Sequence, residues 1–268
     1  MPLFRRRAAD AGDLETELER ADAALEEGDP RAAQRIAEAV LKSAPKGSRE
    51  AAAAQVVRAE ALRGMERFRE AEKAAAQACH WDAEDGAAWF ERGMAAYRLG
   101  RFEDAVAWLD EAATLDPEDA HAWNALGRAR IWLDQKPEAK DAFRRAATLD
   151  SEHFVVPLRI AAHDFDRIAA DVWKSIPHAF KERMDNTVVA VEELPDEEDV
   201  EDGTDPDLLG IYSGGTVLGD DYPERIVLYQ RNHENVCATL GDLVEEIRRT
   251  ILHEVGHHFG MDHDELPY

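Results

Sequence analysis

Residues 253–263 combine the side chains of a metal site with those of a general base. They read His-Glu-Val-Gly-His-His-Phe-Gly-Met-Asp-His, so the stretch has the pattern H-E-x-x-H-x-x-G-x-x-H and holds four of the ten histidines. Residues four apart lie on one face of an α-helix, so His253 and His257 can offer imidazole nitrogens to one ion. Glu254 lies one position further, where its carboxylate can reach a metal-bound water. The stretch therefore predicts a hydrolytic zinc site.

The end of this stretch supplies candidates for a third ligand. Gly260 can adopt the positive φ that ends a helix, and the turn that follows brings His263 toward the same ion. Three protein ligands leave the fourth tetrahedral position of Zn²⁺ to water, as in catalytic zinc sites. Asp262 and Asp264 flank His263 and remain alternatives to it. His258 points elsewhere on the helix, and we expect it to pack and not to bind metal.

The predicted metal ligands require a helix, and the preceding residues favour one. Apolar side chains recur at helical spacing through 242–259, and this stripe lies nearly opposite the direction of His253 and His257. The stripe consists of Val244, Ile247, Ile251, Val255 and Phe259. We therefore expect a helix over 242–259 that buries one face and turns its histidines toward a cleft.

The charge of the chain excludes some partners. With 32 basic and 57 acidic side chains, its net charge is −25, which argues against binding to nucleic acid or to an anionic membrane. Residues 1–150 carry 23 basic and 30 acidic side chains, and residues 151–268 carry 9 and 27. The negative field of the second half favours cationic substrates, although solubility alone also explains it.

The two cysteines and the N-terminal residues indicate the cellular compartment of the protein. Cys79 and Cys237 are far apart and match no metal-ligand or redox spacing. Basic residues occur within residues 1–7, but no apolar segment of a secretory signal follows them. No window approaches the length of a membrane span. We expect a soluble, cytoplasmic protein.

The first half of the chain repeats with a period of 34 residues. A large residue, a glycine and two alanines recur at this interval, and each unit ends near an aspartate. The pairs are Trp89 and Trp123, Gly93 and Gly127, Ala105 and Ala139, Ala112 and Ala146, and Asp116 and Asp150. This period and pattern are those of tetratricopeptide repeats. The clearest units are 86–119 and 120–153, with weaker ones at 52–85 and 14–47.

Over residues 14–153 the chain thus resembles the tetratricopeptide repeat (TPR) family. The resemblance implies an α-solenoid of stacked helical hairpins that binds a protein or peptide on its concave face. Matching the register places five residues on that face, namely Phe90, Met94, Tyr97, Asn124 and Arg128. These residues could equally pack between helices. Residues 1–13 are expected to form a basic flexible tail.

The pattern changes after the repeats. An amphipathic helix is predicted from Phe165 to Phe180, broken or kinked at Pro177. Strands are predicted at 187–191, at 209–213 and at 225–229. The acidic residues 192–207 are expected to form a mobile surface loop.

This order of elements, together with the metal motif, resembles the small zincin-like metallopeptidases often called minimal zincins. The residues that carry the resemblance lie between 162 and 268, and they include Val189-Ala190-Val191-Glu192, Leu209-Gly210-Ile211-Tyr212 and Arg225-Ile226-Val227-Leu228-Tyr229. It implies a small α+β domain, residues 154–268, in which the strand before the active helix pairs with an extended peptide at a sheet edge. The metzincin group is excluded because its methionine turn lies well downstream of the third histidine, and only five residues follow His263.

The predicted activity is zinc-dependent hydrolysis of peptide bonds. Zn²⁺ on His253, His257 and His263 would lower the pKa of a bound water to about 7, and Glu254 would act as general base. Tyr212, in a glycine-flanked segment, is the candidate for a transition-state helper. The repeats would recruit a protein partner or the substrate. Two alternatives remain: a TPR adaptor whose zinc domain is catalytically idle, and a zinc hydrolase acting on a non-peptide amide.

Overall fold

The chain divides into two compact units. The computed structural model describes residues 11–177, 184, 187–213 and 224–258, with the backbone alone for Ala11, His257 and His258. Unit 1 comprises residues Met1–Leu149, and unit 2 comprises residues Asp150–Tyr268. Each unit is described by itself below.

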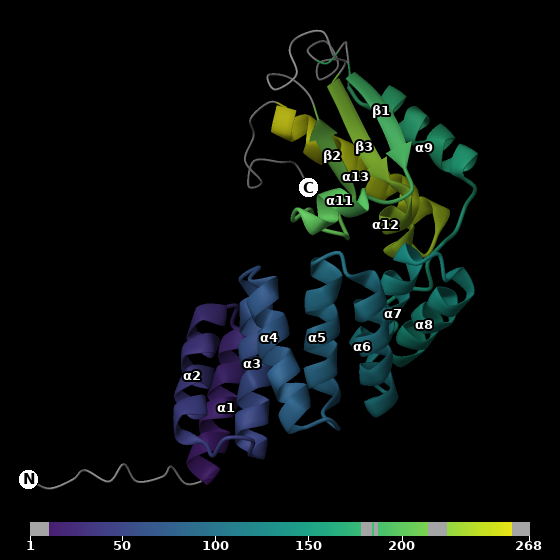
Figure 1. Cartoon of the computed structure of the whole chain (residues 1–268). Coiled ribbons are helices and arrows are strands. Elements are labelled where there is room, and N and C mark those ends of the chain that lie inside the picture. The colour runs from purple at the N-terminus through teal and green to yellow at the C-terminus, as the bar shows by residue number, and fades with distance from the viewer. Residues whose placement is uncertain (1–10, 178–183, 185–186, 214–223, 259–268) are drawn as a thin grey trace, which may run out of the picture. The chain divides into compact units, whose positions relative to one another are not determined.

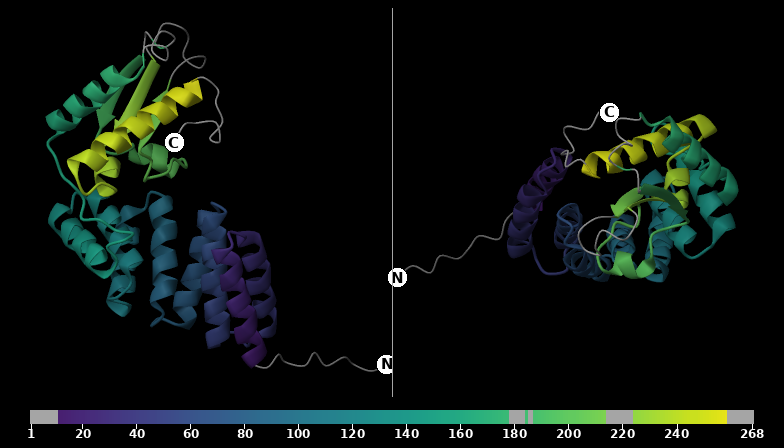
Figure 2. Two further views of the ribbon diagram at one scale, coloured as in Figure 1. Left: turned by 180° about the vertical axis from the view of Figure 1, so that it is seen from behind. Right: turned by 90° about the horizontal axis from the view of Figure 1, so that it is seen from above.

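Unit 1 is a stack of helical hairpins in which each helix packs on the next (Figures 1 and 2). Its helices are α1 (Ala11–Glu26), α2 (Pro30–Ser43), α3 (Arg49–Gly64), α4 (Phe68–Trp81), α5 (Gly86–Arg98), α6 (Phe102–Leu115), α7 (Ala120–Trp132) and α8 (Lys136–Leu149). The α-solenoid predicted from the 34-residue period is confirmed. Helix α1 begins at Ala11, so the last three residues of the predicted tail 1–13 are helical.

The repeats reproduce the same local interactions one period apart. Asp85 accepts a hydrogen bond from the backbone N–H of Ala87 and caps α5, and Asp119 caps α7 through the N–H of His121. Such caps satisfy N–H groups that the first helical turn leaves without partners. The starts of α5 and α7 are thus specified by an aspartate at the same repeat position.

The recurring tryptophans also have a structural reason. The indole Nε1–H of Trp89 donates to the carbonyl of Ala83 at 2.9 Å, and that of Trp123 donates to the carbonyl of Pro117 at 3.0 Å. Both bonds span six residues and close the turn that precedes the helix. Each tryptophan therefore fixes its own turn.

Close helix packing explains the recurring glycines. A Cβ at Gly93 would lie 2.6 Å from Cγ of Leu109, and a Cβ at Gly127 would lie 2.9 Å from the ring of Phe143. Real Cβ atoms do not approach neighbours so closely, so only glycine lets the two helices of each hairpin meet at this distance.

Unit 2 is an α+β domain built on a three-stranded sheet, as predicted. Its elements are α9 (Ala162–Ser175), β1 (Thr187–Glu192), α11 (Glu197–Glu201), β2 (Gly210–Ser213), β3 (Glu224–Tyr229), α12 (Gln230–Asn235) and α13 (Leu240–His258). The strand order is β1-β3-β2, with β1 parallel and β2 antiparallel to the central β3. Strand β2 therefore lies at an edge of the sheet.

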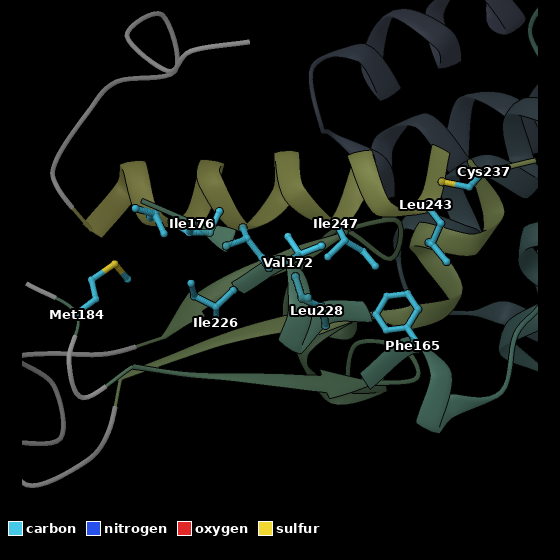
Figure 3. Close-up of a cluster of buried hydrophobic side chains, with 12 residues drawn as sticks. Phe165, Val172, Ile176, Met184, Ile226, Leu228, Cys237, Leu243 and Ile247 are labelled. Carbon is cyan, nitrogen blue, oxygen red and sulfur yellow. The ribbon is translucent and has the colours of Figure 1, made fainter. Parts of the chain in front are cut away.

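The core of unit 2 lies between one face of the sheet and two helices (Figure 3). Ile226 and Leu228 project from β3 toward Phe165 and Val172 of α9 and Ile247 of α13, and all five side chains are at most 4% exposed. Alternate residues of a strand point to the same face, so both helices cover the same side of the sheet.

Of two predictions for unit 2, the break of the helix at Pro177 is confirmed, and the loop at 192–207 is wrong in part. Helix α9 ends at Ser175, because Ile176 is held extended before Pro177, whose ring disfavours a helical residue in front of it. Phe180, where the helix was predicted to end, lies outside the described residues. The acidic segment 192–207 is not wholly a loop: it contains α11, whose Val200 is completely buried.

Helix α12 has no counterpart in the prediction, and it is buried although it is polar. Glu234 is 0% exposed and accepts hydrogen bonds from Arg159 at 3.1 Å, from the backbone N–H of Ile160 at 3.1 Å and from Arg231 and Gln230 at 2.8 Å. Paired charges and satisfied hydrogen bonds make such burial tolerable. The cluster fastens the segment before α9 to the end of the sheet.

Neither cysteine forms a disulfide, and both are buried. Within the part of the chain that the structure describes, no helix has the length and apolar character needed to cross a membrane.

Candidate active site

One continuous helix carries the motif. Helix α13 spans Leu240–His258, close to the predicted 242–259, and includes positions 253, 254 and 257. It begins with a reciprocal cap, in which the N–H of Thr239 donates to the Asp242 carboxylate at 2.9 Å and the N–H of Asp242 donates to the Thr239 hydroxyl at 3.2 Å. A reciprocal cap satisfies two backbone donors at once. The helix start is thereby fixed about four turns before the motif.

The apolar stripe of α13 anchors the motif to the core. Of the predicted stripe, Ile247, Ile251 and Val255 are no more than 1% exposed, as is Leu243. The predicted Val244 is half-buried, and Phe259 lies outside the described residues. Because Leu243, Ile247, Ile251 and Val255 recur every four positions, one face of the helix is buried. The position of Glu254 is therefore set by the packing of the helix against the sheet.

Glu254 is a buried carboxylate held by the edge strand. It is 8% exposed, and its Oε2 accepts a hydrogen bond from the backbone N–H of Tyr212 at 2.8 Å. Burial raises the pKa of Glu254 to about 7, and the Tyr212 N–H opposes this rise by stabilising the ionised form. A carboxyl group with a pKa near neutrality suits a general base that must also release its proton.

The pairing of β2 explains why this N–H is available. Tyr229 donates its N–H to Leu209, so positions alternate from there between bonded and non-bonded pairs. Tyr212 lies opposite Ile226 at a non-bonded position, so its N–H faces away from β3. The Glu254 carboxylate on α13 accepts the hydrogen bond from this outward-facing N–H.

The side chain of Tyr212 is separate from this contact. Burial, followed by the Glu224 carboxylate, raises the pKa of its phenol to about 12, so the hydroxyl keeps its proton at neutral pH. The predicted helper role of the Tyr212 hydroxyl remains a prediction. The contact between the Tyr212 backbone and Glu254 was missed by sequence reasoning, although a predicted strand preceding the motif was a signal for it.

A cavity of about 390 Å³ opens beside Glu254. It is bounded by β2, by the segment before it and by α13. Its lining consists of Asp205, Asp207, Leu208, Leu209, Gly210, Glu246, Arg249, Thr250, His253 and Glu254. The candidate base and one predicted metal ligand, His253, thus face the same cavity, as a substrate site requires.

The donor set fits a zinc ion in residue type. His253 is half-buried, and the helical backbone places position 257 one turn further along α13. The side chain of His257 and the residues Asp262, His263 and Asp264 lie outside the described part of the chain. Among the side chains that are described, no group of three or more His, Cys, Asp or Glu is arranged to hold a metal. His253 and a buried carboxylate on one cavity are compatible with a catalytic zinc site.

The predicted binding face of the repeats is only partly accessible. Met94 is 9% exposed and Tyr97 is 1% exposed, with the Tyr97 hydroxyl 3.3 Å from Nε1 of Trp132. These two residues pack between helices. Phe90, Asn124 and Arg128 are half-buried, so three of the five candidate residues remain reachable by a partner.

Comparisons with known proteins agree with this division of the chain. Residues 184–268 match the model of the zincin-like metallopeptidase family, and residues 18–64 and 56–120 match a tetratricopeptide repeat model. Helices α7 and α8 lie beyond the matched repeats, although they reproduce the contacts of α5 and α6. No curated protein matches the chain.

Some solved structures are similar to the chain at low sequence identity. A MamA fragment (residues 41 to the end) from Desulfovibrio magneticus RS-1 is 18% identical, with a TM-score of 0.45 over 55% of this chain and 79% of its own. A thermophilic TPR protein from Thermus thermophilus is also 18% identical, with a TM-score of 0.45 over 52% of this chain and 75% of its own.

Proposed function

Since the chain joins a tetratricopeptide repeat region to a zincin-like metallopeptidase domain, we propose that it is a zinc-dependent peptidase with Glu254 as general base. The proposed zinc ligands are His253, His257 and His263. The observation that carries the proposal is the Glu254 carboxylate. It is buried, fixed by the edge strand and adjacent to a cavity that His253 also lines.

Zinc, when bound, supplies a Lewis acid for the scissile carbonyl and lowers the pKa of a coordinated water to about 7. The protein supplies the proton transfers. The Tyr212 N–H orients the Glu254 carboxylate through Oε2, and this carboxylate would take the proton of the attacking water and pass it to the leaving amine. The raised pKa of Glu254 makes both transfers accessible near neutral pH.

The third ligand is tested by substitution of His263. A His263→Ala chain should bind zinc at least about tenfold more weakly than wild type, whereas Asp262→Asn and Asp264→Asn should bind it normally. If one of the aspartate variants loses zinc and His263→Ala retains it, the ligand assignment moves to that carboxylate.

The repeat region supports a second part of the proposal, that unit 1 recruits a protein partner or the substrate. The half-buried side chains of Phe90 and Asn124 offer contact area on α5 and α7. Full-length protein should capture specific proteins that a Phe90→Ala/Asn124→Ala variant does not. Equal capture by both would place the binding surface elsewhere.

The central experiment measures cleavage of a peptide library by the wild type and by Glu254→Gln. We expect the variant to lose at least a factor of about 10³ in kcat, since the glutamine cannot accept a proton. Glu245→Gln is a matched control on the same helix, because its side chain is 68% exposed. Cleavage by Glu254→Gln at the wild-type rate would show that the base is assigned wrongly.

A further inference from the structure

Thr250 connects three elements of unit 2 at a point one helical turn before Glu254. We propose that Thr250 is a positioning residue: its hydroxyl ties α13 to the buried His233, and its methyl group sets the spacing between α13 and β2. Together these contacts hold the Tyr212 N–H on the Glu254 carboxylate. The inference rests on the proposed function, because it matters for activity only if Glu254 is the base.

The first contact involves His233 of α12. This side chain is 0% exposed, with Nδ1 3.0 Å from the carbonyl of Tyr229 and Nε2 3.1 Å from Oγ1 of Thr250. A carbonyl only accepts, so Nδ1 carries the proton, and in neutral His233 the Nε2 atom accepts from the Thr250 hydroxyl. The same hydroxyl lies 3.0 Å from the carbonyl of Glu246 and can share its proton with it. Thr250 is thereby joined to the end of β3.

The second contact is between the Thr250 methyl group and β2. A Cβ at Gly210 would lie 2.8 Å from Cγ2 of Thr250 and 2.8 Å from the carbonyl oxygen of Val227. The backbone of β2 is therefore pressed between α13 and β3 with no space for a side chain. Any shift of Thr250 toward the sheet must move β2, and any shift away leaves β2 without support.

The contact between Thr250 and β2 affects Glu254 because of the residue spacing along α13 and β2. Thr250 and Glu254 are four residues apart, so they lie on the same face of α13. Gly210 and Tyr212 are two residues apart, so they lie on the same side of β2. The contact of Thr250 with Gly210 and that of Glu254 with Tyr212 are thus consecutive contacts of one interface between helix and strand.

A small displacement is enough to affect catalysis. The 2.8 Å bond from Tyr212 orients the carboxylate, and a shift of about 1 Å in a catalytic group can cost on the order of 100-fold in rate. Thr250 is 6% exposed, so water does not readily replace the hydrogen bond to His233. The tie is internal to unit 2.

The test uses the full chain and Thr250→Val, which keeps the shape of the side chain and removes the hydroxyl. We expect hydrogen exchange at the Tyr212 amide to become about tenfold faster, kcat to fall about tenfold and KM to stay within about twofold. Bound zinc should remain unchanged. Gly210→Ala, which forces β2 away from Thr250, should produce the same changes. Thr148→Val is the control, because Thr148 makes a similar bond to the carbonyl four residues earlier but is exposed in α8.

A double substitution distinguishes loss of the hydrogen bond between Thr250 and His233 from a general loss of packing. His233→Asn combined with Thr250→Val should slow kcat no more than the more damaging single change, because both remove one interaction. Wild-type exchange at Tyr212 and wild-type kcat in Thr250→Val would overturn the inference, as would additive effects in the double variant. If instead Glu254→Gln retains activity while Thr250→Val speeds exchange at Tyr212, the proposed function fails and the structural tie stands.

Discussion

The two units of this protein are stabilised by contacts of different range along the chain. In unit 1 the same short-range contacts recur every 34 residues, such as the bonds of Trp89 and Trp123 to carbonyls six residues earlier. In unit 2 the decisive contacts are unique and distant, since 75 residues separate Arg159 from Glu234 and 42 separate Tyr212 from Glu254. Repetition places equivalent contacts at many positions of unit 1, whereas each of these polar contacts of unit 2 occurs once and joins distant segments.

The largest effect on this comparison is expected from Glu234→Gln. The substitution removes the charge that Arg159 and Arg231 share, and breaking a buried ion pair costs about 3–5 kcal/mol. Denaturant-dependent hydrogen exchange at the β3 amides should show this loss, while the amides of α5 keep their protection. Glu193→Gln, which alters a 58% exposed partner of Arg231, should cost under about 1 kcal/mol. Equal costs would mean that burial of Glu234 is not decisive.

The second prediction concerns how the stability of unit 2 depends on pH. Burial lowers the pKa of His233 from 6.5 to about 4, so the unfolded chain binds a proton more readily than the folded one. The contribution of neutral His233 to the free energy of unfolding is fully present above pH 6.5 and is lost as the pH falls toward 4. This contribution is about 3 kcal/mol. In His233→Asn, the free energy of unfolding measured by hydrogen exchange should lack this pH-dependent contribution. An unchanged pH dependence in the variant would contradict the assignment.

The glycines of unit 1 provide a comparison within the repeats. Gly93→Ala and Gly127→Ala should each cost about 1–3 kcal/mol, because the new Cβ would overlap Leu109 or Phe143. Gly12→Ala is the control: among the described residues, no atom beyond its chain neighbours and its own helix backbone lies within 4 Å of a Cβ at this position, so the helix preference of alanine should leave stability unchanged or raise it. Circular dichroism in denaturant follows these changes. Costs that differ widely between Gly93 and Gly127 would show that the repeats are not equivalent.

The smallest expected effect concerns the turns of the repeats. Trp89→Phe and Trp123→Phe each remove one hydrogen bond from an exposed turn, so each should cost about 1 kcal/mol. Because the two bonds occupy the same repeat position, their effects on the free energy of unfolding should be equal and additive. Strongly unequal costs would show that the two repeats are similar in sequence but not in the energetics of their turns.

The sequence predicted unit 1 well because its contacts are local. A period of 34 residues identifies which tryptophans, glycines and aspartates are equivalent, and their interactions join residues near in the chain, such as Trp89 with Ala83 and Gly93 with Leu109. The strands and the helix of the metal motif were also predicted, since apolar periodicity extends over each of them. Those features depend on neighbours close in the chain.

Helix α12 shows why the rest was not predictable. Its six residues, Gln230–Asn235, are all polar and carry no apolar periodicity, which is typical of an exposed segment. Five of them are buried because Arg159, Ile160 and Thr250 satisfy their polar groups from distant positions. The contact of Tyr212 with Glu254 was hidden for the same reason, because it uses a backbone N–H whose direction depends on strand register.

The most direct test of the account measures bound zinc and peptide cleavage on the same preparations of wild type and Glu254→Gln. We predict one zinc per chain in both proteins and cleavage by the wild type alone, because Glu254 moves protons without binding the metal. A wild-type chain without zinc, or a Glu254→Gln chain that cleaves at the wild-type rate, would contradict the central claim.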